Sequence, residues 1–237
     1  MRRGFPVWMI NQRGTEYSRK HNTLDSGSKE YFDVSLTDQW LDIKANLGIV
    51  KAYTGYELVD YVGYSGATSQ MLFALSSEEP YLIDKVRKVV LLAPCTIYAL
   101  APPGSLEIFA AQLEILEIPG ANWEADKAKV CSITSKKICE SMDSWDGLQP
   151  TSLKSNVHIG QIFTVKKFQE YAEDWPSNKK GREIDLTKVQ NIPVSLYTAQ
   201  FDEVCEGWYA DQAKEDLDEV LVNFEVETDP IGHLFYA

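Results

Sequence analysis

The sequence predicts an α/β fold with a mostly parallel sheet. Strand-like apolar runs alternate with helix-like stretches along much of the chain, as expected when each strand is followed by a crossover helix. The run from Val86 to Ala93 has a continuous apolar centre and ends at Pro94, which is typical of a parallel strand covered on both faces. With 237 residues, of which 44% are hydrophobic, the chain can bury one large core.

Five segments are expected to form strands. The first, Phe5 to Ile10, is apolar and β-prone and runs into the polar loop at residues 11–14, so we expect a buried strand that ends in a loop. The other four are Leu58 to Val62, Val86 to Ala93, Pro193 to Ala199 and Leu221 to Val226.

Helices are expected between most of these strands. From Ser35 to Ala52 the apolar residues follow a helical period, and Gly55 just beyond favours a stop. A second helix, Gly66 to Leu75, begins soon after the strand that ends at Val62. Only a short turn therefore separates that strand from its helix.

Residues 96–190 break the alternation of strands and helices. We therefore predict a core made of residues 1–95 and 191–237, with residues 96–190 inserted as a helical cap. The stretch from Leu106 to Leu116 has its apolar side chains on one helical stripe. Two interpretations stay open for it: a helix packed on the core, or a lid whose apolar face meets lipid or shields a site.

The charge balance restricts the partners that the chain can bind. With 23 Lys and Arg against 35 Asp and Glu, the net charge is -12, which argues against nucleic acid or an anionic membrane as the main partner. Neutral or apolar ligands fit this charge better. No run of 18 apolar residues occurs, so neither a transmembrane segment nor a signal peptide is expected.

Four cysteines are spread along the chain: Cys95, Cys131, Cys139 and Cys205. Their spacing contains no CxxC pair, so a zinc site is not expected. Cys131 and Cys139 are close enough to bridge across a turn. Whether they form a disulfide or remain two thiols stays open, because spacing alone does not supply the geometry.

A turn of small residues lies between the second predicted strand and its helix. Gly63, Tyr64, Ser65, Gly66 and Ala67 occupy the place of a nucleophile elbow, which predicts an α/β-hydrolase fold. The sharp turn requires small residues two positions before and after the serine, and Gly63 and Ala67 meet that requirement. The elbow exposes the Ser65 hydroxyl, and the backbone N–H of Gly66 can stabilise a developing oxyanion.

The serine hydroxyl needs a base within hydrogen-bond reach. Hydrolases of this fold order their residues as serine, then acid, then histidine, which excludes His21 because it precedes Ser65. His158 lies inside the predicted cap and is expected to be a packed or hydrogen-bonded residue. His233 follows the last predicted strand on a loop, so we assign it as the base.

The acid should follow the preceding strand and reach the histidine's Nδ1–H. Asp202 stands three residues after the predicted strand ending at Ala199, and it is our candidate. Its neighbours Glu203 and Glu206 remain alternatives. Asp229, only four residues before the histidine, is more typical of a turn residue.

Four stretches around these residues resemble the acid lipase family, which includes gastric and lysosomal lipases and cholesteryl ester hydrolases. Residues 4–14 are similar to the family's strand that ends in an Asn-x-Arg-Gly word. Residues 61–65 resemble its Tyr-Val-Gly-His-Ser elbow, and residues 92–94 match its Leu-Ala-Pro. Residues 232–235 resemble the loop of its catalytic histidine.

The resemblance implies hydrolysis of triglycerides or sterol esters without a cofactor or metal. It also implies a cap over the site, which allows a transient contact with a lipid interface. An endolysosomal or secreted location is implied as well. Neutral lipids or other esters would then be the partners.

The chain departs from the family pattern at several points. Tyr64 stands where the family has histidine, and Ala67 replaces the usual second glycine of the elbow. The family's His-Gly loop, which donates a second oxyanion N–H, is missing before residue 4, and the chain stops four residues after His233, where the family has a closing helix. The sequence therefore looks cut at both ends. Two hypotheses follow: an active serine esterase or lipase, or an impaired, fragmentary relative that binds lipid without turnover.

Overall fold

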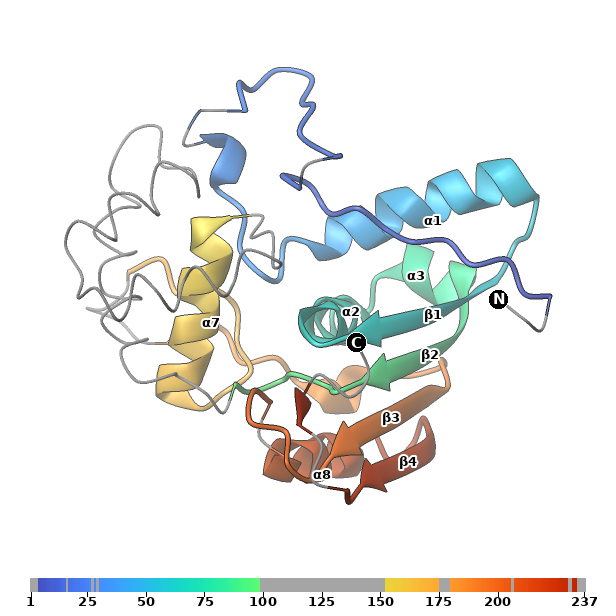
Figure 1. The fold of residues 1–237 in the computed structure, drawn as a ribbon, viewed down its shortest axis with the longest axis vertical. Helices are drawn as coiled ribbons and strands as arrows, with labels where there is room; N and C mark the ends of the chain where they lie inside the picture. The colour runs from blue at the N-terminus through green and yellow to red at the C-terminus, as the bar shows by residue number, and fades with distance from the viewer. Residues whose placement is uncertain are drawn as a thin grey trace.

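The computed structural model describes residues 4–15, 17–26, 28, 30–98, 152–174, 180–205, 207–229 and 232–233. Within these ranges, four strands form one sheet in the order β1-β2-β3-β4, and every neighbouring pair is parallel (Figure 1). The strands are β1 (Val59–Tyr64), β2 (Val86–Leu92), β3 (Val194–Ala199) and β4 (Leu221–Glu227). The predicted α/β fold with a parallel sheet is confirmed.

Helices connect and cover these strands. Helix α2 follows β1 directly, and α8 lies between β3 and β4 in the chain and packs against β3. The helical elements are η1 (Glu30–Phe32), α1 (Trp40–Thr54), α2 (Gly66–Ser76), α3 (Pro80–Lys85), α7 (Leu153–Val165), η2 (Leu186–Lys188) and α8 (Gly207–Asp216).

Helix α2 is buried along most of its length in the described structure. Nine consecutive residues from Thr68 to Ser76 are buried, and Met71 and Leu72 have no exposed surface. The helix packs against β1, α1, α3 and η2. Because it follows β1 with a single residue between them, this packing fixes the turn that carries Ser65.

The joint between β2 and β3 is the shortest ladder of the sheet. These strands pair at four positions, Val89–Leu92 with Val194–Tyr197, whereas β1–β2 and β3–β4 each pair at six. About a hundred residues separate β2 from β3 in the chain. This long connection therefore begins and ends at the two strands that share the shortest ladder.

The prediction of a buried strand at Phe5 to Ile10 is wrong. This segment has no strand structure, and its apolar side chains are exposed, with Phe5 at 73% and Met9 at 87%. Trp8 packs near the end of α1, its ring centroid 5.8 Å from that of Tyr53. A strand needs a hydrogen-bonded neighbour, and no described residue pairs with this segment.

The first predicted helix begins later than its pattern indicated. Ser35 and Asp38 form a local turn, in which the Ser35 N–H and hydroxyl both donate to Asp38 Oδ2 at 2.8 and 2.7 Å. Helix α1 starts at Trp40 and ends before Gly55, whose φ of +72° closes the helix. Serine and aspartate side chains form local hydrogen bonds of this kind in place of a helix, so the apolar period continued into a turn that precedes α1.

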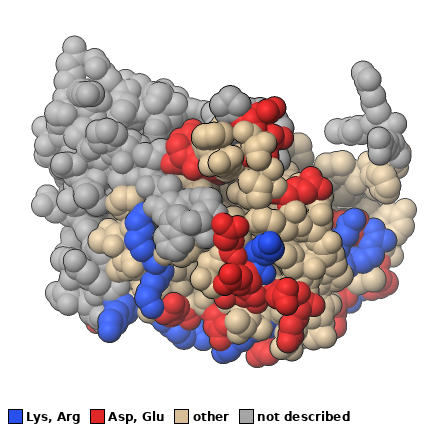
Figure 2. Space-filling model, turned by 90° about the horizontal axis from the view of Figure 1, so that it is seen from below, with Lys and Arg blue, Asp and Glu red and all other residues tan. Residues whose placement is uncertain are grey.

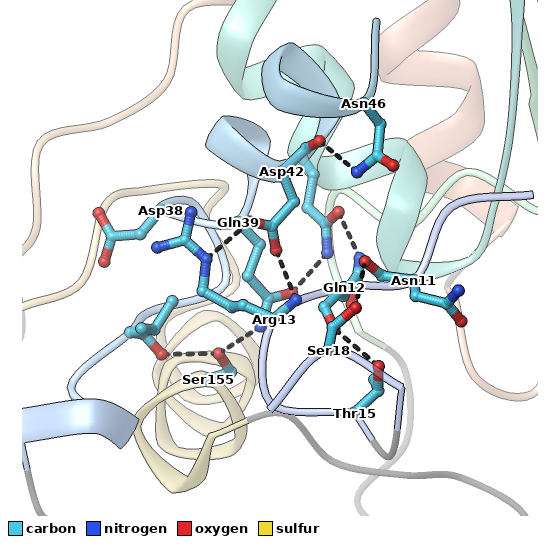
Figure 3. A network of polar contacts seen from close by, with 12 residues as sticks. Asn11, Gln12, Arg13, Thr15, Ser18, Asp38, Gln39, Asp42, Asn46 and Ser155 are labelled. Carbon is cyan, nitrogen blue, oxygen red and sulfur yellow. Dashed lines mark hydrogen bonds and ion pairs between the residues drawn. The ribbon is translucent and has the colours of Figure 1, made fainter. Parts of the chain in front are cut away.

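The loop at residues 11–14 is held to α1 by a charged pair (Figure 3). The backbone N–H of Arg13 donates to Asp42 Oδ2 at 2.9 Å, and its guanidinium Nε donates to Oδ1 at 2.7 Å. Asp42 is buried, so its carboxylate depends on these two donors. The arginine of the Asn-x-Arg-Gly word therefore anchors the loop.

A chain of amides continues from this loop through the interior. The Gln12 amide donates to Gln70 on α2 at 2.7 Å, Gln70 donates to Gln39 at 2.6 Å, and Gln39 donates to Ser155 on α7 at 2.9 Å. The Ser155 hydroxyl then donates to the Val34 carbonyl at 2.8 Å. The buried amides of Gln39 and Gln70 are therefore both hydrogen-bonded, and this row of side-chain hydrogen bonds connects α2 with α7 (Figure 3).

The predicted cap lies mostly outside the described residues, as do Cys131, Cys139 and the stretch from Leu106 to Leu116. The division of the chain into core and cap therefore stays a prediction. In the described part of 96–190, α7 is helical, and an isolated bridge pairs Gln169 with Glu183.

The described surface carries charges of both signs. Figure 2, seen from the side of β4 and α8, shows acidic side chains gathered near the middle of the face, with Lys and Arg mostly toward its margins. Among the described residues, no helix is long and apolar enough to cross a membrane.

His158 is buried on α7. Its Nε2–H donates to the Gln169 carbonyl at 2.8 Å, while Nδ1 has no partner among the described residues. Burial lowers the pKa of His158 to about 4, because a charged imidazole would lose its hydration. His158 is thus a packed residue, as expected.

This histidine should make the fold sensitive to acid. An unfolded histidine titrates at about 6.5, so His158 contributes stability above that pH and loses it as the pH falls toward 4, by up to roughly 3 kcal/mol. In urea unfolding followed by tryptophan fluorescence at pH 7, 5.5 and 4.5, His158→Gln should weaken this pH dependence. The matched variant of exposed His21, His21→Gln, should retain the original slope. Equal slopes in all three proteins would contradict the assignment.

Candidate active site

Ser65 stands alone on the turn between β1 and α2. Its φ of 54° and ψ of -124° lie in a sparsely populated region for a residue with a side chain, a conformation that costs on the order of 1–3 kcal/mol. The Ser65 N–H donates to the Leu92 carbonyl of β2 at 3.1 Å, and its own carbonyl accepts from the Thr68 N–H at 2.9 Å. The strained backbone is therefore held from both sides.

The turn leaves little space around Gly63. A Cβ at this position would lie 2.8 Å from Cε1 of Tyr61 and 3.3 Å from the Ala67 carbonyl oxygen. The requirement for a small residue there thus has a steric cause. Gly66 opens α2, and the first N–H groups of a helix have no acceptor within the helix. The Gly66 N–H therefore has no acceptor within α2.

Ser65, His233 and Asp202 lie in one hydrogen-bonded line. His233 Nε2 is 2.8 Å from Ser65 Oγ, and its Nδ1 is 2.8 Å and 3.0 Å from the two oxygens of Asp202. The three residues follow β1, β4 and β3, whose carboxyl ends lie at one edge of the sheet. The parallel sheet therefore brings together residues up to 168 positions apart.

The hydrogen bonds define the state of the imidazole. Since a carboxylate only accepts, the proton of the neutral ring lies on Nδ1 and donates to Asp202. Nε2 is then an acceptor that faces the Ser65 hydroxyl. His233 and Asp202 are both buried, whereas Ser65 is partly exposed.

Asp202 also organises the loop on which it lies, residues 199–205, here called the acid turn. Its Oδ1 accepts the backbone N–H of Val204 at 2.9 Å and of Cys205 at 2.8 Å. Its own N–H donates to the Ala199 carbonyl at 3.2 Å. The carboxylate thus shapes the acid turn and holds His233 at the same time.

Glu203, the alternative acid, contacts the backbone and not the ring of the histidine, at residues 232–233, here called the base loop. Its Oε2 accepts the backbone N–H of His233 at 3.3 Å and not the imidazole. A Cβ on Gly232 would lie 2.1 Å from the same oxygen. Glycine at 232 therefore lets the base loop approach Glu203. The other alternative, Glu206, lies outside the described residues.

Tyr64 lies beside the base. Its hydroxyl donates to the His233 carbonyl at 2.9 Å, and the two ring centroids are 5.3 Å apart. Burial raises the pKa of Tyr64, and the nearby carboxylates Asp202 and Glu203 raise it further. The phenol therefore stays protonated and keeps its hydrogen bond to the base loop.

The other two histidines do not reach this site. His21 is exposed, and its Nδ1 accepts the N–H groups of Thr23 and Leu24 at 3.1 and 2.8 Å. His158 is buried on α7. Only His233, of the three, approaches Ser65 in the described structure.

A disulfide between Cys95 and Cys205 lies next to the Nδ1 side of His233, a pairing that the sequence did not predict. Cys205 Sγ is 3.6 Å from His233 Nδ1. These three side chains form the one group among the described residues with metal-ligand spacing, but the two sulfurs are bonded to each other and leave no thiolate to bind an ion. The available signal was that both cysteines closely follow predicted strands.

Comparisons with curated proteins relate the chain to lipases. It is 36% identical over 199 residues to a protein of Schizosaccharomyces pombe named as a probable lipase, an alignment covering 73% of this chain and 42% of that protein. It is 37% identical over 211 residues to lysosomal acid lipase/cholesteryl ester hydrolase of Macaca fascicularis, covering 75% of this chain and 51% of that protein. The chain thus spans about half the length of these relatives. The similarity to acid lipases is confirmed.

Solved structures support the fold. A crystal structure described as an aryl esterase of Burkholderia cenocepacia aligns with 94% of this chain and 71% of its own length, with a TM-score of 0.50 and 12% identity. This likeness supports the α/β-hydrolase fold. No family model matches the sequence.

The Tyr64 hydroxyl should hold the base loop. Tyr64→Phe keeps the ring beside His233 but removes the donor to its carbonyl, so the free energy of unfolding should fall by about 1 kcal/mol. Urea unfolding measures this loss. Tyr53→Phe, at an exposed tyrosine of α1, serves as the control and should leave stability within about 0.5 kcal/mol. An equal loss in both variants would show that the contact with His233 contributes nothing.

Proposed function

We propose that this relative of the acid lipases is a serine carboxylic-ester hydrolase with Ser65 as nucleophile, His233 as base and Asp202 as the acid. The observation that carries the proposal is the line of hydrogen bonds from Ser65 through His233 to Asp202. The sequence similarity to lipases supports the same reaction class. In this line, Nε2 of His233 faces the Ser65 hydroxyl as an acceptor, as the first step requires.

The reaction begins with attack by Ser65 Oγ on the ester carbonyl carbon. As the new C–O bond forms, the hydroxyl proton passes to His233 Nε2, 2.8 Å away, and the carbonyl oxygen becomes an oxyanion. The Gly66 N–H, at the positive end of α2, stabilises this charge. The strained turn at Ser65 keeps the nucleophile raised above the sheet.

Asp202 stabilises the imidazolium that forms in this step. The carboxylate keeps Nδ1 protonated, so Nε2 is always the atom that faces Ser65. Collapse of the intermediate breaks the ester C–O bond, and His233 returns its proton to the leaving alcohol. Water, deprotonated by the same Nε2, then attacks the acyl-serine. The bond between the acyl carbon and Oγ breaks, the carboxylic acid leaves, and His233 returns the proton to Ser65 Oγ.

Neutral lipid esters are the proposed substrate class. The net charge of -12 disfavours anionic substrates, and the Macaca fascicularis relative is named a cholesteryl ester hydrolase. Triglycerides or sterol esters would enter under the proposed cap at residues 96–190, which could touch a lipid interface. A panel of p-nitrophenyl esters from acetate to palmitate should show kcat/KM rising beyond butyrate. A maximum at acetate would contradict a lipid substrate.

Ser65 is tested by covalent labelling. A fluorophosphonate probe should label the purified chain, and Ser65→Ala should abolish the label because the probe's phosphorus bonds to the serine oxygen. Ser77→Ala is the matched control at the opposite end of α2, where the hydroxyl donates to the Phe73 carbonyl, and it should label normally. Failure of the folded original chain to label would overturn catalysis and would favour lipid binding without turnover.

The role of Asp202 as the acid is tested by comparing its substitution with that of Glu203. Asp202→Asn should lower the hydrolysis rate by about 10³–10⁴, because an amide nitrogen facing Nδ1 favours the wrong tautomer of His233. Glu203→Gln should lower it less than tenfold, since that carboxylate accepts only a backbone N–H of the base loop. Initial rates with p-nitrophenyl butyrate measure both. The reverse order of effects would assign the acid to Glu203.

A further inference from the structure

We propose that the Cys95–Cys205 disulfide positions Asp202 and His233 for catalysis by fixing the acid turn to the helix of the nucleophile, α2. The inference rests on the proposed ester hydrolysis and adds two positioning residues to it. Both cysteines are fully or almost fully buried, and their Cα atoms are 5.0 Å apart, within the ordinary range for a disulfide.

Cys205 contacts both the acid and the base. Its backbone N–H donates to Asp202 Oδ1 at 2.8 Å, and its sulfur lies 3.6 Å from His233 Nδ1. The same Asp202 oxygen is 3.0 Å from Nδ1. Any movement of Cys205 therefore changes the surroundings of the hydrogen bond that fixes the histidine tautomer.

Cys95 is held to α2 and to the elbow. Its N–H donates to the Thr68 hydroxyl at 2.9 Å, and that hydroxyl donates to the Ser65 carbonyl at 2.5 Å. The Cys95 carbonyl accepts the hydroxyl of Ser69, which is also on α2. The S–S bond thus links the acid turn to the structure that carries the nucleophile.

The disulfide lies where the sheet gives the least support. The ladder between β2 and β3 covers four positions and ends at Leu92 and Tyr197, before the two cysteines. Beyond its last pair, the described residues show the Ala93 N–H donating to the Tyr197 carbonyl at 2.8 Å and an isolated bridge between Tyr98 and Cys205. The disulfide therefore joins the segment after β2 to the segment after β3, beyond the last pair of the ladder and within the acid turn.

Loss of the bond should affect turnover more than substrate binding. Two thiols cannot approach as closely as bonded sulfurs, so the acid turn must move relative to Cys95. A shift on the order of 1 Å in catalytic groups can cost about a hundredfold in rate. We expect kcat to fall about tenfold to a hundredfold, with KM within about threefold, because the cysteines lie behind His233 and not beside Ser65.

The experiment compares the oxidised chain, the same chain after dithiothreitol, and the double variant Cys95→Ala/Cys205→Ala. Dithiothreitol delivers two electrons and two protons to the disulfide and becomes a cyclic disulfide itself. Circular dichroism verifies folding, and p-nitrophenyl butyrate gives kcat and KM. Proton NMR follows the low-field resonance of the His233 Nδ1 proton, which reports its hydrogen bond to Asp202.

Reduction should lower kcat and weaken the Nδ1 resonance, and reoxidation should restore both. The double variant should match the reduced chain and should not respond to dithiothreitol. If the double variant fails to fold, reduction and reoxidation of Cys131→Ala/Cys139→Ala, whose two remaining cysteines are Cys95 and Cys205, give the same answer. An unchanged kcat and resonance in the folded, reduced chain would overturn the inference.

The NMR readout separates this inference from the proposed function. If the oxidised chain hydrolyses no ester and does not label at Ser65, the proposed function fails. The Nδ1 resonance still decides the positioning role in that case, since it does not require turnover. A resonance lost on reduction supports the role, and an unchanged resonance rejects it.

Discussion

The parallel pairing of β1 to β4 is the constraint on which the rest of the structure depends. Parallel strands send all their carboxyl ends to one edge, so the segments after them must meet there. Ser65 follows β1, Cys95 follows β2, Asp202 follows β3 and His233 follows β4. Residues from four distant parts of the chain consequently form one cluster without any local sequence connection.

Three residues of the acid turn contact or support His233, the proposed catalytic base. Asp202 accepts two backbone N–H groups of its own turn and still holds the imidazole of His233. Glu203 accepts the backbone N–H of the same histidine, and Cys205 contributes the disulfide. Since one short loop combines these contacts, its position and the orientation of the base depend on each other.

The strain at Ser65 is compensated by packing and by polar contacts further inside. The buried helix α2 holds the elbow, and Gln70 on that helix belongs to the amide chain that runs from the loop at 11–14 to α7. Buried amides are costly when unpaired, so a helix with such partners has one well-defined position. The elbow is therefore attached to a helix with one well-defined position, as a preorganised nucleophile requires.

The sequence by itself determined the four paired strands, the elbow and the candidates Ser65, Asp202 and His233, because hydrophobic patterns, turn chemistry and chain order are local properties. It failed at Phe5 to Ile10, where an apolar run lacks a pairing neighbour among the described residues, and at the start of α1, where a turn from Ser35 to Asp38 precedes the helix. Only the tertiary structure decided that Cys95 joins Cys205, that Tyr64 holds the His233 carbonyl and that Glu203 misses the imidazole. These contacts depend on distances of a few ångströms between loops that are remote in sequence, and no periodic pattern encodes such distances.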